Sequence, residues 1–328
     1  MMLDLGRIGQ FTGHGLLRSE GTSLNTPSLP ALFQGGAAGR FGPTRTPAMM
    51  LHLDHALILV RNLAAAADDY RRLGFTLTPQ GGHPALGTAN HTVMFGRDYL
   101  ELLEVVQRTP GSERWARILD RREGFGAMAL GTPDAAATRR QLVERGIEVP
   151  PLIDFVRPVA LADGGVEARF TVAHLPDTAT PALPAFFCQQ HTAEFVWRPE
   201  WQQHANTALG VAGLTVVDAD PERLAPAYER LVGRASVHPH PGGFAVDLRG
   251  TRLWIVRPEF AAERLGTPLM WTRQPTPVGV SITVRSLAAA GTLLTGNGIR
   301  FQPFGKRSLL IGPTATRGVH LELIEAPK

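Results

Sequence analysis

The chain has 328 residues, 44% of them hydrophobic, which is enough to form the cores of two domains. Its longest apolar runs fall far short of the ~20 residues that a membrane-spanning helix needs. The net charge is +4, but the arginines are dispersed among acidic residues, which argues against a nucleic-acid-binding surface. The single cysteine, Cys188, cannot form an intramolecular disulfide, and this favours a reducing, cytoplasmic setting.

Residues 1–48 differ in composition from the rest of the chain. They are rich in Gly, Ser, Thr and Pro, show no sustained hydrophobic period and include no secretory signal. Two interpretations are open: a disordered leader, or a start of translation at the Met49-Met50 pair that precedes the first predicted strand.

Residues 51–106 predict one βαβββ unit. Its helix has Asn62 as N-cap and ends at Gly74, and the turn-rich stretch from Gly81 to Pro84 separates its later strands. The predicted elements are a strand over 54–60, a helix over 63–73, a strand from Phe75, and strands over 91–95 and 99–105.

The βαβββ pattern recurs three times, which predicts an α+β fold of four modules paired into two domains, 50–205 and 206–328. The joint at 191–207 contains Trp197 and Trp201 and is expected to be a packed strap. The later predicted strands are 126–131, 153–157, 167–173, 185–190, 211–217, 244–248, 252–257, 280–284, 300–304, 308–311 and 318–325. The later predicted helices are 112–122, 135–145, 221–231 and 287–295.

A His and a Glu occupy inward positions in the first module. Because side chains alternate along a strand, His55 shares a face with Leu57 and Leu59, and Glu101 shares one with Tyr99 and Leu103. If the two strands are neighbours in a curved sheet, the imidazole and the carboxylate converge on one concavity.

The four modules are compared by aligning their helix starts, Asn62, Asp134, Asp220 and Ser286. Residues that cannot bind metal then stand opposite His55, namely Ala127, Gly213 and Gly279. At the position of Glu101 the other modules have Gln189, Ile255 and Glu322. The first domain thus keeps His55, Glu101 and Gln189.

These three side chains predict a divalent metal site, with Zn, Fe, Ni or Mn as the candidate ions. His191 lies two residues beyond Gln189 on the same strand face and is the candidate for the missing ligand. Glu101 is the candidate catalytic residue, and a bound ion would act as a Lewis acid on two adjacent substrate oxygens. His83 and His91 are alternative ligands, although a hydrogen-bonded core histidine explains His91 equally well.

Four further residues are candidates for binding substrate. Thr88 and Asn90 lie in the connection between two strands and offer hydrogen bonds to substrate oxygens. Arg157 and Arg198 are candidate anchors for a carboxylate, because a guanidinium pairs with it through two parallel bonds.

The segments LDHALILV, GGxPxxGTxNxxxxF and YLELLEV resemble the vicinal oxygen chelate (VOC) superfamily, in its glyoxalase-like branch, and FFCQQHTAEFVWRPEW is similar to a later part of that domain. The resemblance implies paired βαβββ modules that form half-open barrels around a site. Members include glyoxalases, dioxygenases, epimerases and metal-free binders. A glyoxalase takes two metal ligands from each module, a pattern from which this chain departs at Ala127 and Gln189.

Two functions are open on this sequence. One is a metal-assisted lyase, isomerase or dioxygenase acting on a small oxygen-rich molecule. The other is a metal-free protein that binds or sequesters a small molecule. A homodimer, with the second domain as its interface, is a further expectation.

Overall fold

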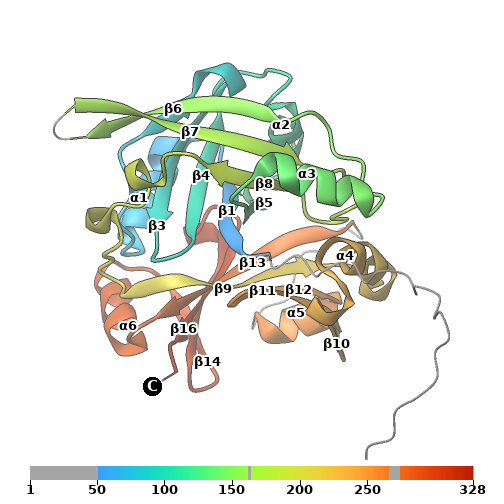
Figure 1. Cartoon of the computed structure of the whole chain (residues 1–328). Coiled ribbons are helices and arrows are strands. Elements are labelled where there is room, and N and C mark those ends of the chain that lie inside the picture. Colours follow the sequence, from blue (N-terminus) through green and yellow to red (C-terminus); the bar gives the residue numbers. More distant parts are fainter. Residues whose placement is uncertain (1–50, 162–163, 266–273, 328) are drawn as a thin grey trace, which may run out of the picture. The chain divides into compact units, whose positions relative to one another are not determined.

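The computed structural model describes residues 51–161, 164–265 and 274–327, which belong to one compact unit. The predictions for residues 1–48 lie outside the described residues. The described chain forms two eight-stranded mixed sheets with helices beside them (Figure 1). The predicted α+β fold of paired half-barrels is thereby confirmed. None of the helices in these ranges is long and apolar enough to cross a membrane.

The first sheet has the strand order β2-β3-β4-β1-β5-β8-β7-β6. Its edge strands β2 and β6 contact each other, which closes the sheet toward a barrel. The strands are β1 (Leu53–Leu59), β2 (Gly81–His83), β3 (Thr88–Met94), β4 (Tyr99–Val105), β5 (Gly124–Gly131), β6 (Ile153–Leu161), β7 (Gly164–His174) and β8 (Ala185–Gln190).

The second sheet repeats this order as β10-β11-β12-β9-β13-β16-β15-β14. In each of the four modules the first and last strands pair in parallel, so the chain contains one structural unit four times. The strands are β9 (Ala208–Val217), β10 (Val237–His240), β11 (Gly243–Leu248), β12 (Thr251–Val256), β13 (Thr276–Val284), β14 (Phe301–Phe304), β15 (Ser308–Ile311) and β16 (His320–Glu325).

The module helices begin where the sequence provides a cap. Asn62, Asp134 and Ser286 each accept a hydrogen bond from the backbone N–H three residues on, as an N-cap does. The helices are α1 (Leu63–Arg72), α2 (Glu113–Leu119), α3 (Ala135–Glu144), α4 (Ala225–Val232), α5 (Pro258–Arg264) and α6 (Leu287–Gly296).

The structure differs from the predicted elements in four places. The strand predicted from Phe75 forms instead at Gly81–His83, and the short elements β10 and α5 were not predicted. The single helix predicted over 221–231 is a 3-10 turn, Pro221–Leu224, followed by α4. Pro226 has no N–H to donate to the preceding turn, so the helix begins again at this point.

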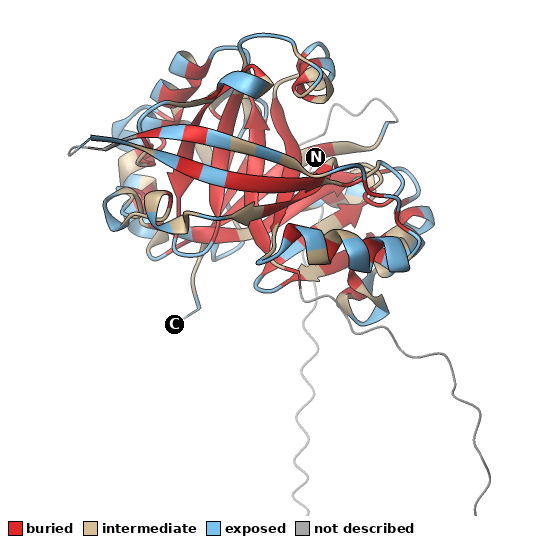
Figure 2. Cartoon of the chain, turned by 45° about the horizontal axis from the view of Figure 1, so that its top comes forward, coloured by how far each residue is buried: buried red, intermediate tan, exposed pale blue. Residues whose placement is uncertain are grey.

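Alternate faces of the strands contribute to different apolar clusters. One face of each sheet joins a large cluster that contains Ala56 and Ile58 of β1, Leu214 and Val216 of β9, and Tyr70 of α1. The opposite face of the first sheet, which includes Leu57, Phe170 of β7 and Phe186 of β8, forms a separate cluster inside the barrel. Figure 2 shows the buried residues concentrated along the strands. The inward face of the first sheet is therefore free to form a site.

The predicted strap between the two sheets is packed, as expected. Trp197 stands edge-on to the ring of Tyr99, and Asn206 donates its side-chain N–H to the carbonyl of Leu73. His204 bridges the N–H of Thr76 and the carbonyl of Met94. The predicted domain boundary at 205/206 falls in this strap, between the last strand of one sheet and the first strand of the next.

Asp98 links the β3–β4 turn to the second sheet. Its Oδ1 accepts a hydrogen bond of 2.9 Å from the backbone N–H of Val211, and its side chain is buried. Burial raises the pKa of Asp98 from 3.8 to about 6, against the opposing effects of the Val211 N–H and Arg97. The folded chain therefore binds the Asp98 proton more tightly than the unfolded chain.

This difference predicts a pH-dependent effect of Asp98→Asn. The stability that the Asp98 proton provides is present below pH 3.8 and is lost as the pH rises through about 6. The asparagine keeps the acceptor for Val211 and does not titrate. Between these two pH values the free energy of unfolding of the variant should rise, relative to that of the wild type, by up to about 3 kcal/mol. Urea denaturation across this range measures it, and a constant difference would contradict the assignment.

Candidate active site

His55 and Glu101 meet inside the first barrel. Strands β1 and β4 are parallel neighbours, with Leu57 in register with Glu101. The Nε2 atom of His55 lies 3.4 Å from Oε2 of Glu101, and both residues are buried. The ring of His55 stacks on Tyr99 with ring centroids 4.4 Å apart. The predicted convergence of imidazole and carboxylate is therefore present in the structure.

The observed strand register changes the comparison of modules. Leu57 pairs with Glu101, and in the same way Ala129 pairs with Phe186, Thr215 with Trp254, and Ser281 with Glu322. The equivalents of Glu101 are therefore Phe186, Trp254 and Glu322. The predicted equivalents Gln189 and Ile255 are wrong, by three residues and by one.

Gln189 has a different position from the one predicted. Its Oε1 accepts a hydrogen bond of 2.9 Å from the backbone N–H of Ala135, the first residue of α3. Glu104 does the same for Leu63 of α1, and Glu325 for Leu287 of α6. Each acceptor stands three residues after the position equivalent to Glu101. Gln189 thus belongs to the helix side of its strand and is not brought together with His55 and Glu101.

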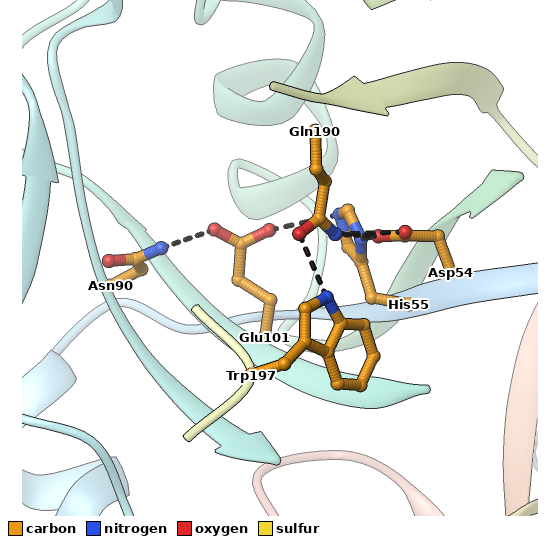
Figure 3. A network of polar contacts seen from close by, with 6 residues as sticks. All are labelled: Asp54, His55, Asn90, Glu101, Gln190 and Trp197. Carbon is orange, nitrogen blue, oxygen red and sulfur yellow. Dashed lines mark hydrogen bonds and ion pairs between the residues drawn. The ribbon is translucent and has the colours of Figure 1, made fainter. Parts of the chain in front are cut away.

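A continuous line of polar contacts holds the pair in place (Figure 3). Asp54 Oδ1 lies 2.6 Å from Nδ1 of His55. Gln190 donates to both carboxylate oxygens of Asp54, at 3.1 and 2.9 Å, and accepts a hydrogen bond from the indole N–H of Trp197. At the other end, Asn90 Nδ2 donates to Oε1 of Glu101 at 2.6 Å.

Asp54 and His55 are consecutive, and consecutive strand residues normally face opposite ways. Here the pairing of β1 with β5 shifts register between Leu53 and His55, and such an irregularity bends a strand locally. The shift occurs at the two residues whose side chains contact each other.

The ionisable groups in this network of contacts change one another's pKa. Burial alone would lower the pKa of His55, but the contacts with Asp54 and Glu101 outweigh it and raise the pKa to about 9. Burial would raise the pKa of Glu101, but His55, His83 and Asn90 lower it to about 2. Near neutral pH the chain therefore holds an imidazolium against a carboxylate.

The pair lies at the wall of a cavity with an internal volume of about 620 Å³, part of it open to solvent. Its polar lining includes His83, Thr88, Asn90 and Arg157 beside the central pair. His83 Nδ1 lies 2.9 Å from the hydroxyl of Thr88, and burial lowers the pKa of His83 to about 4, so its ring is neutral. The apolar lining includes Leu57, Leu86, Tyr99, Leu103, Trp115, Phe155, Phe170, Val172 and Phe186.

Thr88, Asn90 and Arg157, predicted to bind substrate, all line this cavity. Arg198 does not: its guanidinium pairs with Glu200 and lies over the ring of Trp201 in the strap.

The remaining histidine candidates also lie outside the cavity lining. His191 is exposed and contacts the hydroxyl of Thr171, on the same side of the sheet as Gln189. His91 bonds to the carbonyl of Thr78, as its alternative interpretation as a core histidine predicted.

Sequence reasoning missed Asp54 and Gln190, as well as the aromatic lining. Asp54 stands directly before His55, and its contact depends on the register shift, which no local pattern reveals. Gln190 is adjacent to the predicted Gln189, so an alternation shifted by one residue finds it. Phe155 and Phe170 belong to the β6–β7 pair. Both strands were predicted, but which of their residues face the interior of the barrel was not.

The described residues of the second sheet include no equivalent pair. Glu322 occupies the position of Glu101, but Gly279 replaces the histidine. Both oxygens of Glu322 are bonded, one by Ser281 and Arg264 and the other by Ser308. Its carboxylate therefore serves a local polar cluster.

His55 and Glu101 fit two positions around a divalent ion. Their donor atoms approach one point from two strands, and Asp54 orients the ring through Nδ1, as partners of metal-bound histidines commonly do. The buried Oδ1 of Asn90 has no hydrogen-bond partner, but it points away from His55 and Glu101, and the side-chain N–H of Asn90 faces Glu101 instead (Figure 3).

The second module adds no metal ligand, since Ala127 and Phe186 stand at its equivalent positions. Within the described ranges, no group of three or more His, Cys, Asp or Glu is placed to hold an ion. The donor set thus fits an ion held from one side, with other positions left to substrate or water.

Paired βαβββ modules around a cavity with a His–Glu pair define the VOC class of proteins. A family model described as a glyoxalase-like domain matches residues 53–232, more than half of the chain. The chain therefore belongs to the glyoxalase-like domain family of the VOC superfamily. A search of curated proteins finds no significant sequence match.

Solved structures support the same fold. A hypothetical protein from Staphylococcus aureus has a TM-score of 0.62 and 15% identity, over 84% of this chain and 100% of that chain. A mutant of 4-hydroxymandelate synthase from Streptomyces coelicolor has a TM-score of 0.52 and 13% identity, over 84% and 94%. A xylose isomerase-like TIM barrel/4-hydroxyphenylpyruvate dioxygenase fusion protein has a TM-score of 0.51 and 12% identity, over 85% and 50%. At these identities the similarity establishes the fold alone.

The packing around Asn90 predicts that substitution by alanine destabilises the protein at one of two adjacent glycines and not at the other. A Cβ atom at Gly81 would lie 2.6 Å from Oδ1 of Asn90, whereas one at Gly82 would lie 3.5 Å from the carbonyl oxygen of Thr88. Gly81→Ala should therefore displace Asn90 from Glu101 and lower the free energy of unfolding by about 1–3 kcal/mol. Gly82→Ala is the matched control and should change it by less than about 0.5 kcal/mol. Equal effects in urea denaturation would argue against this placement of Asn90.

Proposed function

We propose that the chain is a metal-assisted enzyme that acts on a small, oxygen-rich organic molecule in the first barrel. The observation that carries the proposal is the 3.4 Å approach of His55 Nε2 to Glu101 Oε2 inside a buried cavity. The reaction classes that suit such a site are those of a lyase, an isomerase or a dioxygenase. The names of two structures with this fold, a synthase and a dioxygenase fusion, support an enzyme.

The residues of the chain have separate tasks in this proposal. Asp54 fixes the ring of His55 through Nδ1 and leaves Nε2 directed at Glu101, while Gln190 donates to Asp54 and is itself held by the indole N–H of Trp197. Bound between His55 and Glu101, a divalent ion would supply Lewis-acid chemistry to two adjacent substrate oxygens.

Glu101 is the proposed catalytic residue because its second oxygen is held by Asn90, which fixes the carboxylate in one orientation. The aromatic lining of the cavity excludes water from the reacting groups and strengthens the electrostatic interactions among them.

A second function is favoured by one specific observation. Ala127 and Phe186 stand where the second module would supply ligands, so only one module offers donors. In a metal-free binding protein, His55 and Glu101 would hydrogen-bond the ligand directly. Metal content separates the two functions.

Elemental analysis of the purified full-length protein provides the test. The enzyme proposal predicts close to one divalent ion per chain in the wild type and little or none in His55→Ala and Glu101→Gln. Asp54→Asn should weaken metal binding about 10- to 100-fold, because it removes the partner that orients the imidazole. Glu322→Gln, at the equivalent position of the second sheet, is the control and should keep the metal. A wild-type protein that takes up no ion after incubation with Zn, Fe, Ni or Mn salts would support the binding protein instead.

A further inference from the structure

We propose that the ligand of this cavity is a small organic carboxylate with an apolar body, and that Arg157 binds the carboxylate. The inference rests on the proposed function in one respect, namely that the cavity of the first barrel is the binding site. It adds the chemical class of the substrate and the residue that selects it.

Arg157 is a buried cation for which the described residues provide no counter-ion. The residue is 7% exposed, lies on β6 and lines the cavity. Its Nε has no hydrogen-bond partner, and across the described part of the chain its guanidinium forms no ion pair. Its one specific contact is with the ring of Phe170, 5.8 Å from the guanidinium carbon to the ring centroid.

A buried guanidinium destabilises the folded protein unless a bound ligand provides the opposite charge. Removing a charge from water costs several kcal/mol, which only a partner of opposite charge or a set of hydrogen bonds recovers. The two carboxylates of the site, Asp54 and Glu101, are already engaged with His55, Gln190 and Asn90. An anion that enters the cavity would supply Arg157 with the negative charge that the described residues do not provide.

The surrounding residues favour a carboxylate over a phosphate. Among the described residues, Arg157 is the only Arg or Lys that lines the cavity, and burial lowers the pKa of His83, which lines the same cavity, to about 4. One guanidinium matches the single charge and the two oxygens of a carboxylate. The rest of the lining is largely aromatic and aliphatic, which suits a hydrocarbon body of the ligand.

Arg157 also lies close to the polar groups of the first module. A Cβ atom on Gly81 would be 3.4 Å from Nη1 of Arg157 and 2.6 Å from Oδ1 of Asn90, so both side chains border the same glycine. Asn90 in turn contacts Glu101. A carboxylate on Arg157 would therefore place the neighbouring atoms of the ligand toward Asn90 and Glu101.

The test compares an acid with its neutral amide, 3-phenylpropionate and 3-phenylpropionamide, by isothermal titration calorimetry on the full-length protein. The wild type should bind the acid at least about tenfold more tightly, a difference of about 1.4 kcal/mol. Arg157→Gln should abolish this preference while leaving the affinity for the amide unchanged. Arg157→Lys keeps the charge without the planar fork and should retain part of the preference.

Arg169→Gln is the matched control, because Arg169 is exposed on β7 in the same hairpin, paired with Val156. It should keep the wild-type preference. Titration in the presence of a chelator distinguishes the two proposals: a preference that survives chelation and needs Arg157 supports this inference even if no metal is bound. A preference that disappears on chelation and is unchanged in Arg157→Gln overturns it. Equal affinity of the wild type for acid and amide, or no binding of the acid at millimolar concentration, also overturns it.

Discussion

The site depends on a buried ion pair that the fold must both create and support. His55 and Glu101 are distant in sequence, and only the parallel pairing of β1 with β4 brings them together. Neither group is stable in a protein interior by itself, because burial opposes its charge. Asp54, Gln190 and Asn90 supply the hydrogen bonds that make the arrangement stable, so removal of one member affects the protonation of the others.

Much of the fold could be predicted from the sequence because its local signals agree with its tertiary structure. Each of the helix caps Asn62, Asp134 and Ser286 was recognisable from its residue type and its position before an apolar helix, and strands such as Leu53–Leu59 are short apolar runs rich in branched residues. Elements without such signals were missed. The edge strand β10 is short and contains Pro239, and α5 has only seven residues.

The site was predictable only in part, since register is set by pairing and not by composition. Within one module the alternation sufficed for His55 and Glu101, which lie together as expected, whereas Asn90, predicted in a connection between strands, lies on β3 and contacts Glu101. Between modules, the predicted equivalence was displaced by three residues. It placed Gln189 in the cavity, whereas the observed strand pairing places Phe186 there. The contact of Asp54 with His55 depends on a local irregularity, and the isolation of Arg157 depends on everything around it, so neither is visible along the chain.

The acceptors Glu104, Gln189 and Glu325 have a consequence for how this scaffold can diverge. Each ties the end of a strand to the start of a helix from outside the barrel, three residues beyond a position that faces the interior. Alignment of strand and helix is thereby fixed independently of the inward residue, which is Glu in the first and last modules and Phe in the second. Mutation can therefore change the inward residue of one module while the hydrogen bond between its strand and its helix is retained. Duplicated modules built in this way are well suited to acquire new substrates.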